Sequence, residues 1–367
     1  VAERLADAPH VRDVILSAAA SAREQLLIDA PADQYAMTHS WLFTGPPGSG
    51  RSQAAMAFAA ALVCTDPHEV GCGRCAGCRD ALADQHADVV HVVPKELIIK
   101  TEYIRDIVAQ AARMPTVAAH RVLIIENADR LHPAAADALL KTVEEPPERT
   151  VIIMLAPSTD PEDFSQTLRS RCRHLYIPSP SESELVRILM DEEGASEHDA
   201  RLAAATSLRH VGRARLLVRN PDIQQRRARA INLAELIFHG AQAFQAVGSL
   251  VKATEKEAVD AYAEEDAAER AKLEQALGMG AKGKGAAKAL RGAASSIKEL
   301  ESRQKARGTR RKRDVFDLVL VDLAGVYRDA LVVQSGADVP LTHPDFEPLV
   351  REVADRVPAA GLVACQD

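Results

Sequence analysis

The stretch Gly45-Pro-Pro-Gly-Ser-Gly-Arg-Ser52 decides the fold of this chain. It follows the apolar run Ser40–Thr44, which favours a β-strand, and opens the alanine-rich run Arg51–Val63, which favours an α-helix. A glycine-rich turn in this place is typical of a phosphate-binding loop, because backbone N–H groups at the start of the helix can surround a phosphate. The stretch fits the Walker A pattern at every defined position except one, where Arg51 replaces lysine.

A second motif is altered as well. The apolar run Val122–Ile125 is followed by Glu126-Asn127, where an active hydrolase has Asp-Glu. A neutral Asn127 cannot accept a proton from the attacking water, and the planar fork of Arg51 replaces a compact ammonium poorly. We therefore expect a degenerate site that binds ATP or ADP weakly or not at all. Its residues are Gly45, Gly48, Gly50, Arg51, Ser52, Glu126 and Asn127.

Around this loop, short apolar runs alternate with amphipathic stretches from Thr38 to about Pro178. Such alternation predicts a parallel α/β sheet with helical crossovers. The expected strands are Ser40–Thr44, Asp88–Val93, Val122–Glu126, Val151–Ala156 and His174–Ile177. The expected helices are Arg51–Val63, Thr101–Ala112, Pro133–Glu145 and Ser165–Arg169.

Beyond Pro178 the pattern becomes helical. Ser181, with Glu184 three residues later, forms a capping box, and Asn220-Pro221 marks a boundary. We predict an α/β domain at 1–178, a three-helix lid at 179–220 and an all-α domain at 221–367.

The all-α region contains a charged insert at about 252–313. Its first half, residues 252–279, has four basic and eight acidic residues, whereas residues 280–313 have twelve basic and two acidic residues. The insert has too little apolar surface to build a core, so a solvated long helix or a disordered loop is expected. The other interpretation is an arm that binds the DNA backbone or a partner.

Four of the six cysteines, Cys64, Cys72, Cys75 and Cys78, lie within fifteen residues. Four thiolates at this spacing favour a closed tetrahedral Zn²⁺ site, with glycines allowing the tight turns. Buried free cysteines are the alternative. No open ligand position is evident, so we expect structural zinc in a module at 64–84.

Composition excludes some classes of protein. Hydrophobic residues make up 47% and charged residues 26%, the net charge is −7, and no apolar run is long enough to span a membrane. The acidic balance argues against non-specific nucleic-acid binding over the whole surface. Because the N-terminal residues carry acidic side chains where a signal peptide would be apolar, we expect a cytoplasmic protein.

Three further motifs resemble the clamp-loader branch of the AAA+ proteins: Asn127-Ala-Asp-Arg-Leu131, Ala138-Leu-Leu-Lys-Thr-Val-Glu-Glu-Pro-Pro147 and Ser170-Arg-Cys172. The resemblance covers residues 1–220 and implies a RecA-like domain, a lid and a helical collar. Two bacterial subunit types share this layout, the tau/gamma ATPase motor and the delta-prime stator. The altered Walker motifs are more similar to the stator. The alternative is an active tau/gamma-like motor in which Arg51 and Glu126 still suffice.

The resemblance also implies partners and residue roles. The subunit would join tau/gamma and delta subunits of the DNA polymerase III holoenzyme and load the sliding clamp on primer-template DNA. Arg171 matches an arginine finger that enters the neighbouring ATP site. Ser158 and Thr159 fall in the sensor-one region, and Arg215 falls at the sensor-two position. Arg105 lies on a helix that would face DNA, with a solvated helix face as the alternative.

Overall fold

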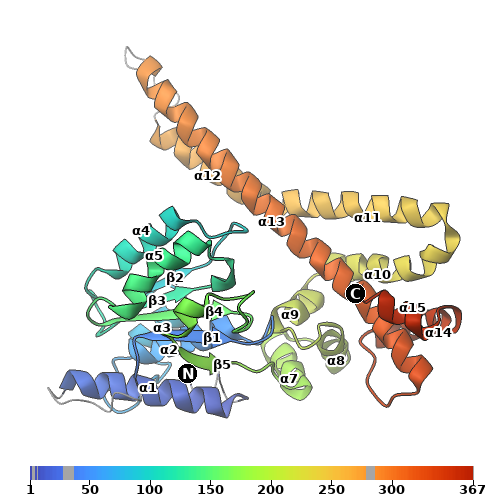
Figure 1. Cartoon of the computed structure of the whole chain (residues 1–367), viewed down its shortest axis with the longest axis horizontal. Helices are drawn as coiled ribbons and strands as arrows, with labels where there is room; N and C mark the ends of the chain where they lie inside the picture. The colour runs from blue at the N-terminus through green and yellow to red at the C-terminus, as the bar shows by residue number, and fades with distance from the viewer. Residues whose placement is uncertain (2–4, 6, 28–36, 278–285, 367) are drawn as a thin grey trace. The chain divides into compact units, whose positions relative to one another are not determined.

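The computed structural model describes residues 1, 5, 7–27, 37–277 and 286–366. The chain forms two compact units (Figure 1). The first contains Val1–Pro94 and Ile98–Arg215, and the second contains Leu216–Asp367 with the short segment Lys95–Leu97. The expected fold class, a parallel α/β sheet followed by helical regions, is confirmed. The division into three domains stays a prediction.

The first unit is built on a five-stranded parallel sheet with the strand order β2-β3-β4-β1-β5. All five predicted strands are present, each within two residues of the expected ends. Their bounds are β1 Ser40–Thr44, β2 Val89–Val92, β3 Arg121–Ile125, β4 Thr150–Ala156 and β5 Arg173–Tyr176. The stretch Gly45–Ser52, which we call the phosphate loop because of its Walker A pattern, follows β1. Strand β1 lies between β4 and β5.

Helices cover both faces of this sheet, so the three central strands are buried throughout. Successive side chains of a strand point to opposite faces. Trp41 and Phe43 therefore pack with α1, α2 and α3, whereas Leu42 packs with α4, α5 and α6. Figure 1 shows these two groups of helices on opposite faces of the sheet. The helices are α1 Pro9–Leu27, α2 Arg51–Leu62, α3 Ala76–Leu82, α4 Thr101–Ala111, α5 Pro133–Glu144 and α6 Gln166–Arg169, with a 3₁₀ turn η2 Ala128–Arg130. Helices α1 and α3 are absent from the sequence prediction.

Three helices follow the sheet, and the first unit ends at Arg215 in the third of them. They are α7 Glu182–Glu193, α8 Glu197–Thr206 and α9 Val211–Arg219. The predicted cap is present, since the backbone N–H of Glu184 donates to Ser181 Oγ at 3.2 Å. Ser196 caps α8 in the same way through the N–H of Asp199. We call these three helices the lid.

The second unit is helical. Its apolar core combines Ile231 and Ala234 of α10 with Val326 and Ala330 of α13, and with residues of α14 and α15. Helix α13 is 50 residues long and lies beside α10, α11 and α12 (Figure 1). The elements are α10 Pro221–Leu236, η3 Ile237–His239, α11 Ala241–Asp260, α12 Ala263–Ala276, α13 Ala286–Ser335, η4 Pro344–Phe346, α14 Glu347–Arg356 and α15 Ala359–Ala364.

In the described part of the charged insert, residues 252–260, 263–276 and 286–313 are helical, and a turn at 261–262 joins the first two of these segments, so the structure matches the expected helix rather than the disordered loop. Within this helical insert Leu300 and Arg307 are buried, at 7% and 5% exposure. Among the described residues, no helix has the length and apolarity needed to cross a membrane.

Candidate functional site

The phosphate loop needs its glycines for two different reasons. Gly48 and Gly50 have φ of 77° and 87°, in the left-handed region that favours glycine. Gly48 is also approached closely by the lid, because a Cβ there would lie 2.2 Å from Cγ of His210. Gly50 is the N-cap of α2, so the first turn of that helix opens directly from the loop.

Arg51 begins α2 and is half-buried. Burial lowers the pKa of its guanidinium, and the nearby carboxylates of Asp129 and Glu126 act in the opposite direction. Its Nη1 is buried without a hydrogen-bond partner among the described residues. The side chain therefore keeps unused bonding capacity beside the loop.

Glu126 follows β3, and its carboxylate is already engaged. His91 on the neighbouring strand β2 contacts it, with 3.0 Å between Nε2 and Oε1, while His91 Nδ1 lies 3.0 Å from Oδ2 of Asp84. The hydrogen bond to Glu126 is the main cause that raises the pKa of His91. For Glu126, burial acts to raise the pKa, but hydrogen bonds from His91 and Ser52 and the charge of Arg51 lower it overall.

Sequence reasoning missed His91. The available signal was a single polar residue within the apolar strand Val89–Val92. The register confirms why it reaches Glu126, since the backbone N–H of Glu126 donates to the carbonyl of Val92 at 2.9 Å. Asn127 has a φ of 51°, a left-handed conformation that asparagine adopts more readily than most residues.

The sensor candidates have local partners. Ser158 Oγ donates to Oδ2 of Asp163 at 2.6 Å and accepts the N–H of Asp160, so it holds the turn after β4. Thr159 accepts a hydrogen bond from Gln166 at its backbone carbonyl. Arg215 forms ion pairs with Glu192 and Glu193 of α7, within the lid. Their sensor roles stay predictions.

Arg171 lies between α6 and β5 and is exposed at the surface. Its Nε pairs with Glu144 at the end of α5, and its Nη1 donates to the carbonyl of Thr167 at 2.9 Å and to Ser170 Oγ at 3.1 Å. The adjacent Cys172 is buried, which raises the pKa of its thiol to about 12. The buried side chain of Cys172 thus fixes the backbone next to Arg171, while the guanidinium of Arg171 stays exposed. Arg105 is also exposed, on α4.

The four predicted cysteine ligands come together. Their Sγ atoms all lie within 4.8 Å of one another, and those of Cys64 and Cys75 are 4.0 Å apart. A tetrahedral zinc thiolate site with Zn–S bonds of about 2.3 Å requires S–S separations of about 3.8 Å, so the cluster fits. Cys64 follows α2, Cys72 and Cys75 precede α3, and Cys78 lies in α3.

Backbone N–H groups stabilise thiolates in this cluster. Cys75 N–H donates to Cys72 Sγ at 3.3 Å, and Cys78 N–H donates to Cys75 Sγ at 3.4 Å. Although burial opposes ionisation, hydrogen bonds from the backbone of Cys78 and Thr65 lower the pKa of Cys75 to about 6. Sequence reasoning missed Arg23 of α1, which donates to the carbonyls of Asp66 and Cys64 and fixes the start of the module.

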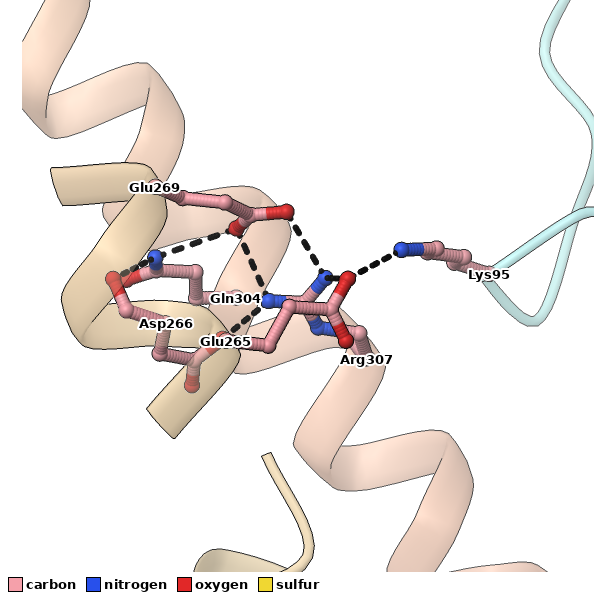
Figure 2. A network of polar contacts seen from close by, with 6 residues as sticks. All are labelled: Lys95, Glu265, Asp266, Glu269, Gln304 and Arg307. Atoms are coloured by element: carbon pink, nitrogen blue, oxygen red, sulfur yellow. Dashed lines mark hydrogen bonds and ion pairs between the residues drawn. The ribbon is translucent and has the colours of Figure 1, made fainter. Parts of the chain in front are cut away.

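Many charged side chains of the insert form ion pairs with one another. Figure 2 shows Arg307 of α13 among carboxylates of α12, at 3.0 Å from Glu265 and 2.8 Å from Glu269, with a further contact to Asp266. The guanidinium also lies over the ring of Tyr262. Nearby, Lys312 and Arg311 pair with Glu255 and Glu257 of α11. The acidic half of the insert therefore neutralises part of its basic half.

Comparison with known proteins agrees with the motifs. Residues 23–181 match the family model described as DNA polymerase III, delta subunit. The DNA polymerase III delta-prime subunit of Bacillus subtilis is 29% identical over 201 residues, 55% of this chain and 60% of that protein. The delta-prime subunit of Escherichia coli is 33% identical over 169 residues, 45% of this chain and 50% of that protein. The resemblance to clamp-loader delta-prime subunits is confirmed.

Identity alone does not separate delta-prime relatives from motor relatives. The tau subunit of Bacillus subtilis is 35% identical over 141 residues, 38% of this chain and 24% of that protein. The chain spans 60% or less of the length of each of these relatives. Which subunit type a sequence represents therefore has to be argued from the residues of the site.

Proposed function

We propose that this chain is the delta-prime stator of a bacterial replicative clamp loader, which hydrolyses no ATP itself and supplies Arg171 to the ATP site of a neighbouring subunit. One observation carries the proposal. The chain has lost the water-polarising acid at Asn127 but keeps an exposed arginine in the Ser170-Arg171-Cys172 motif.

Several contacts support an inactive site. Glu126 is the remaining acid after β3, and it is paired with His91 and hydrogen-bonded by Ser52. Magnesium coordination would require Glu126 and Ser52 to leave these partners. The residues present therefore do not fit a resident Mg²⁺, and ATP hydrolysis by this subunit would lack both its metal and its base.

The surroundings of Arg171 suit a finger that acts on another subunit. Its guanidinium is always charged and planar, so it can contact two oxygens of a γ-phosphate as charge develops there. In the isolated subunit the carboxylate of Glu144 contacts the guanidinium in place of a γ-phosphate. Assembly would exchange a half-exposed carboxylate for a phosphate, and a surface ion pair of this kind costs about 0–1 kcal/mol to give up.

The proposed partners follow from the same role. The subunit would assemble with tau/gamma and delta subunits and, as part of that complex, act on the sliding clamp and on primer-template DNA in the cytoplasm. Arg105 is an exposed candidate for a DNA phosphate contact. Ser158, Thr159 and Arg215 would act as sensors only if a nucleotide occupied the loop.

Zinc is proposed as a structural ion. Cys64, Cys72, Cys75 and Cys78 would hold it, and a closed set of four thiolates leaves no position for a reacting water. The ion would fasten the connection between α2 and α3, where few apolar side chains are available to do so.

An experiment can distinguish the proposed stator from the alternative, an active tau/gamma-like motor. The purified chain should show no ATP turnover above background, and addition to motor and delta subunits should restore clamp loading on primed DNA. Turnover near that of a motor subunit, abolished by Ser52→Ala, would establish the alternative. Failure to join the complex would reject the stator role.

A further inference from the structure

Helix α13 divides the charged residues of the insert between two sides. On one side Arg307 pairs with carboxylates of α12, Arg311 pairs with a carboxylate of α11, and Leu300 is buried. Helices α11 and α12 both contact α13, and Figure 1 shows α12 lying along it. The acidic residues of these two helices therefore neutralise only the arginines that point toward them.

Three basic side chains lie on the opposite side of α13. Lys298, Lys305 and Arg313 are exposed, and steps of seven and eight residues keep them within about 80° of one another around the helix axis. The exposed side chains of Ser302 and Thr309 lie between them on this side. We call these five residues the basic face of α13. Within the described part of the chain, none of its three cations forms an ion pair or a side-chain hydrogen bond.

The carboxylates near the basic face are engaged or lie at its edges. Glu301 pairs with Arg270 of α12 at 3.0 Å. Glu299 is exposed about 120° around the helix from Lys305, and Asp317 is exposed one turn beyond the C-terminal end of the face. The five residues of the face thus carry three positive charges and no negative charge. Because the net charge of the chain is −7, this local excess runs against the balance of the whole molecule.

The spacing of the basic face suits a duplex nucleic acid. A helix rises by about 1.5 Å per residue, so Lys305 lies about 10 Å along the axis from Lys298 and about 12 Å from Arg313. Each strand of duplex DNA carries one phosphate per about 3.4 Å of axis, so the face spans the phosphates of about six base pairs. Lysine, arginine and hydroxyl side chains are typical ligands of backbone phosphates and read no sequence.

We propose that the basic face of α13 binds the phosphate backbone of double-stranded DNA without sequence preference. Ser302 supplies a hydroxyl donor between the cations, whereas Thr309 Oγ1 already donates to the Lys305 carbonyl at 2.9 Å. The surface goes beyond the proposed function, because it lies in the second unit and involves neither Arg171 nor Arg105. A chain that joins the loader and supports clamp loading but binds no duplex would disprove this proposal alone.

Fluorescence anisotropy of a labelled DNA duplex of mixed sequence, titrated with the full chain, tests the surface. Three phosphate contacts give a slope of about −2.7 for the logarithm of affinity against the logarithm of salt concentration, so affinity should fall about fortyfold between about 50 and about 200 mM salt. The combined variant Lys298→Gln, Lys305→Gln and Arg313→Gln should bring this slope close to zero and lower the affinity at about 50 mM salt by about tenfold or more.

The matched control is the combined variant Arg229→Gln, Lys252→Gln and Lys256→Gln. It removes one arginine and two lysines that are exposed on α10 and α11 of the same unit, so it should keep the slope of the parent chain. An equal loss of slope in both variants would mean that net charge decides, and this would overturn the proposal.

Three other results would also overturn it: no binding by the parent chain at about 50 mM salt, an unchanged slope in the first variant, or displacement of the duplex by polyglutamate as effectively as by unlabelled duplex. The last result would assign the basic face to an acidic protein. If the first variant fails to fold, its three single substitutions decide. Each should reduce the slope by about 0.9, and unchanged slopes in all three count against the surface.

Discussion

Arg51 in the first unit and Arg307 in the second are both buried or half-buried arginines beside several carboxylates, yet their bonding differs. Both terminal nitrogens of Arg307 are bonded, to Glu265, Asp266 and Glu269 of α12, and only its Nε lacks a partner. Nη1 of Arg51 lies buried without one, although Asp129 and Glu126 are near enough to influence its pKa.

The difference separates an arginine that links two helices from an arginine with a free N–H group. A guanidinium whose N–H groups are already hydrogen-bonded within the chain, like that of Arg307, links two helices and has few N–H groups left for a ligand. A guanidinium with an unused nitrogen, next to the N-terminus of a helix, keeps capacity for an anion. Perturbing the first unit should therefore change metal content and activity, whereas perturbing the second should change stability.

Removal of zinc should have the largest effect. Structural zinc contributes on the order of 10 kcal/mol of apparent binding free energy, and here it would act only on the first unit. We expect one zinc per chain by metal analysis, and chelation should speed hydrogen exchange in residues 64–84 without altering that of α13. Cys75→Ser should lose the metal, whereas Cys365→Ser should keep it. Full zinc content in Cys75→Ser would contradict the assignment.

Arg171→Ala should remove function and leave stability intact. The reconstituted loader should assemble, while hydrolysis at the ATP site served by Arg171 falls by roughly 10³-fold. Clamp loading rate is the better measurement, because sites served by other subunits contribute to bulk turnover. Arg171→Lys should not rescue loading, since a point charge lacks the guanidinium fork. Arg187→Ala, another exposed arginine, is the control. Normal loading by an assembled Arg171→Ala complex would reject the finger.

Acid should destabilise the second unit through His343. This residue is fully buried, and burial and the charge of Arg227 lower its pKa to about 4. The unfolded chain binds a proton near pH 6.5 and the folded chain does not, so stability is complete above pH 6.5 and falls as the pH drops toward 4. The loss should reach about 2–3 kcal/mol at most.

His343→Gln should flatten this dependence, measured as the urea midpoint between pH 7 and pH 4. His239→Gln changes an exposed histidine in the same unit and should leave the slope as it is. If both variants show the slope of the parent chain, His343 is not the group responsible.

Arg307→Ala should lower the free energy of unfolding of the second unit by about 1–2 kcal/mol. Loss of a buried charge partner costs about 3–5 kcal/mol, but the carboxylates here are roughly one-third exposed or more, so solvent reduces the loss. Arg303→Ala on the same helix should change it by less than about 0.5 kcal/mol. A loss in Arg303→Ala as large as that in Arg307→Ala would contradict the stabilising role of Arg307.

Glu144→Gln should produce the smallest change. Glu144 and Arg171 form a half-exposed ion pair, worth about 0–1 kcal/mol. Releasing Arg171 should therefore raise motor turnover in the reconstituted loader by no more than about fivefold. Glu145→Gln, which changes the next exposed carboxylate, should have no effect. A fall in turnover would mean that Glu144 orients Arg171 rather than competing for it.

The sequence by itself determined the α/β class, all five strands and the cluster of four cysteines. These features depend on local patterns, such as apolar runs of strand length and ligands close together along the chain, which act before any tertiary contact forms. It also identified the two altered Walker positions, because a residue type at a motif position is read directly from the chain.

Only the tertiary structure decided which residues contact one another in the site and in the charged insert. His91 reaches Glu126 through the register of β2 and β3, and His210 reaches Gly48 from the lid, 162 residues further along the chain. Likewise, Arg307 is buried although its local sequence is highly charged, because acidic side chains of α12 surround it. Such contacts depend on the packing of distant segments, and no periodicity or motif spacing records which segments will meet.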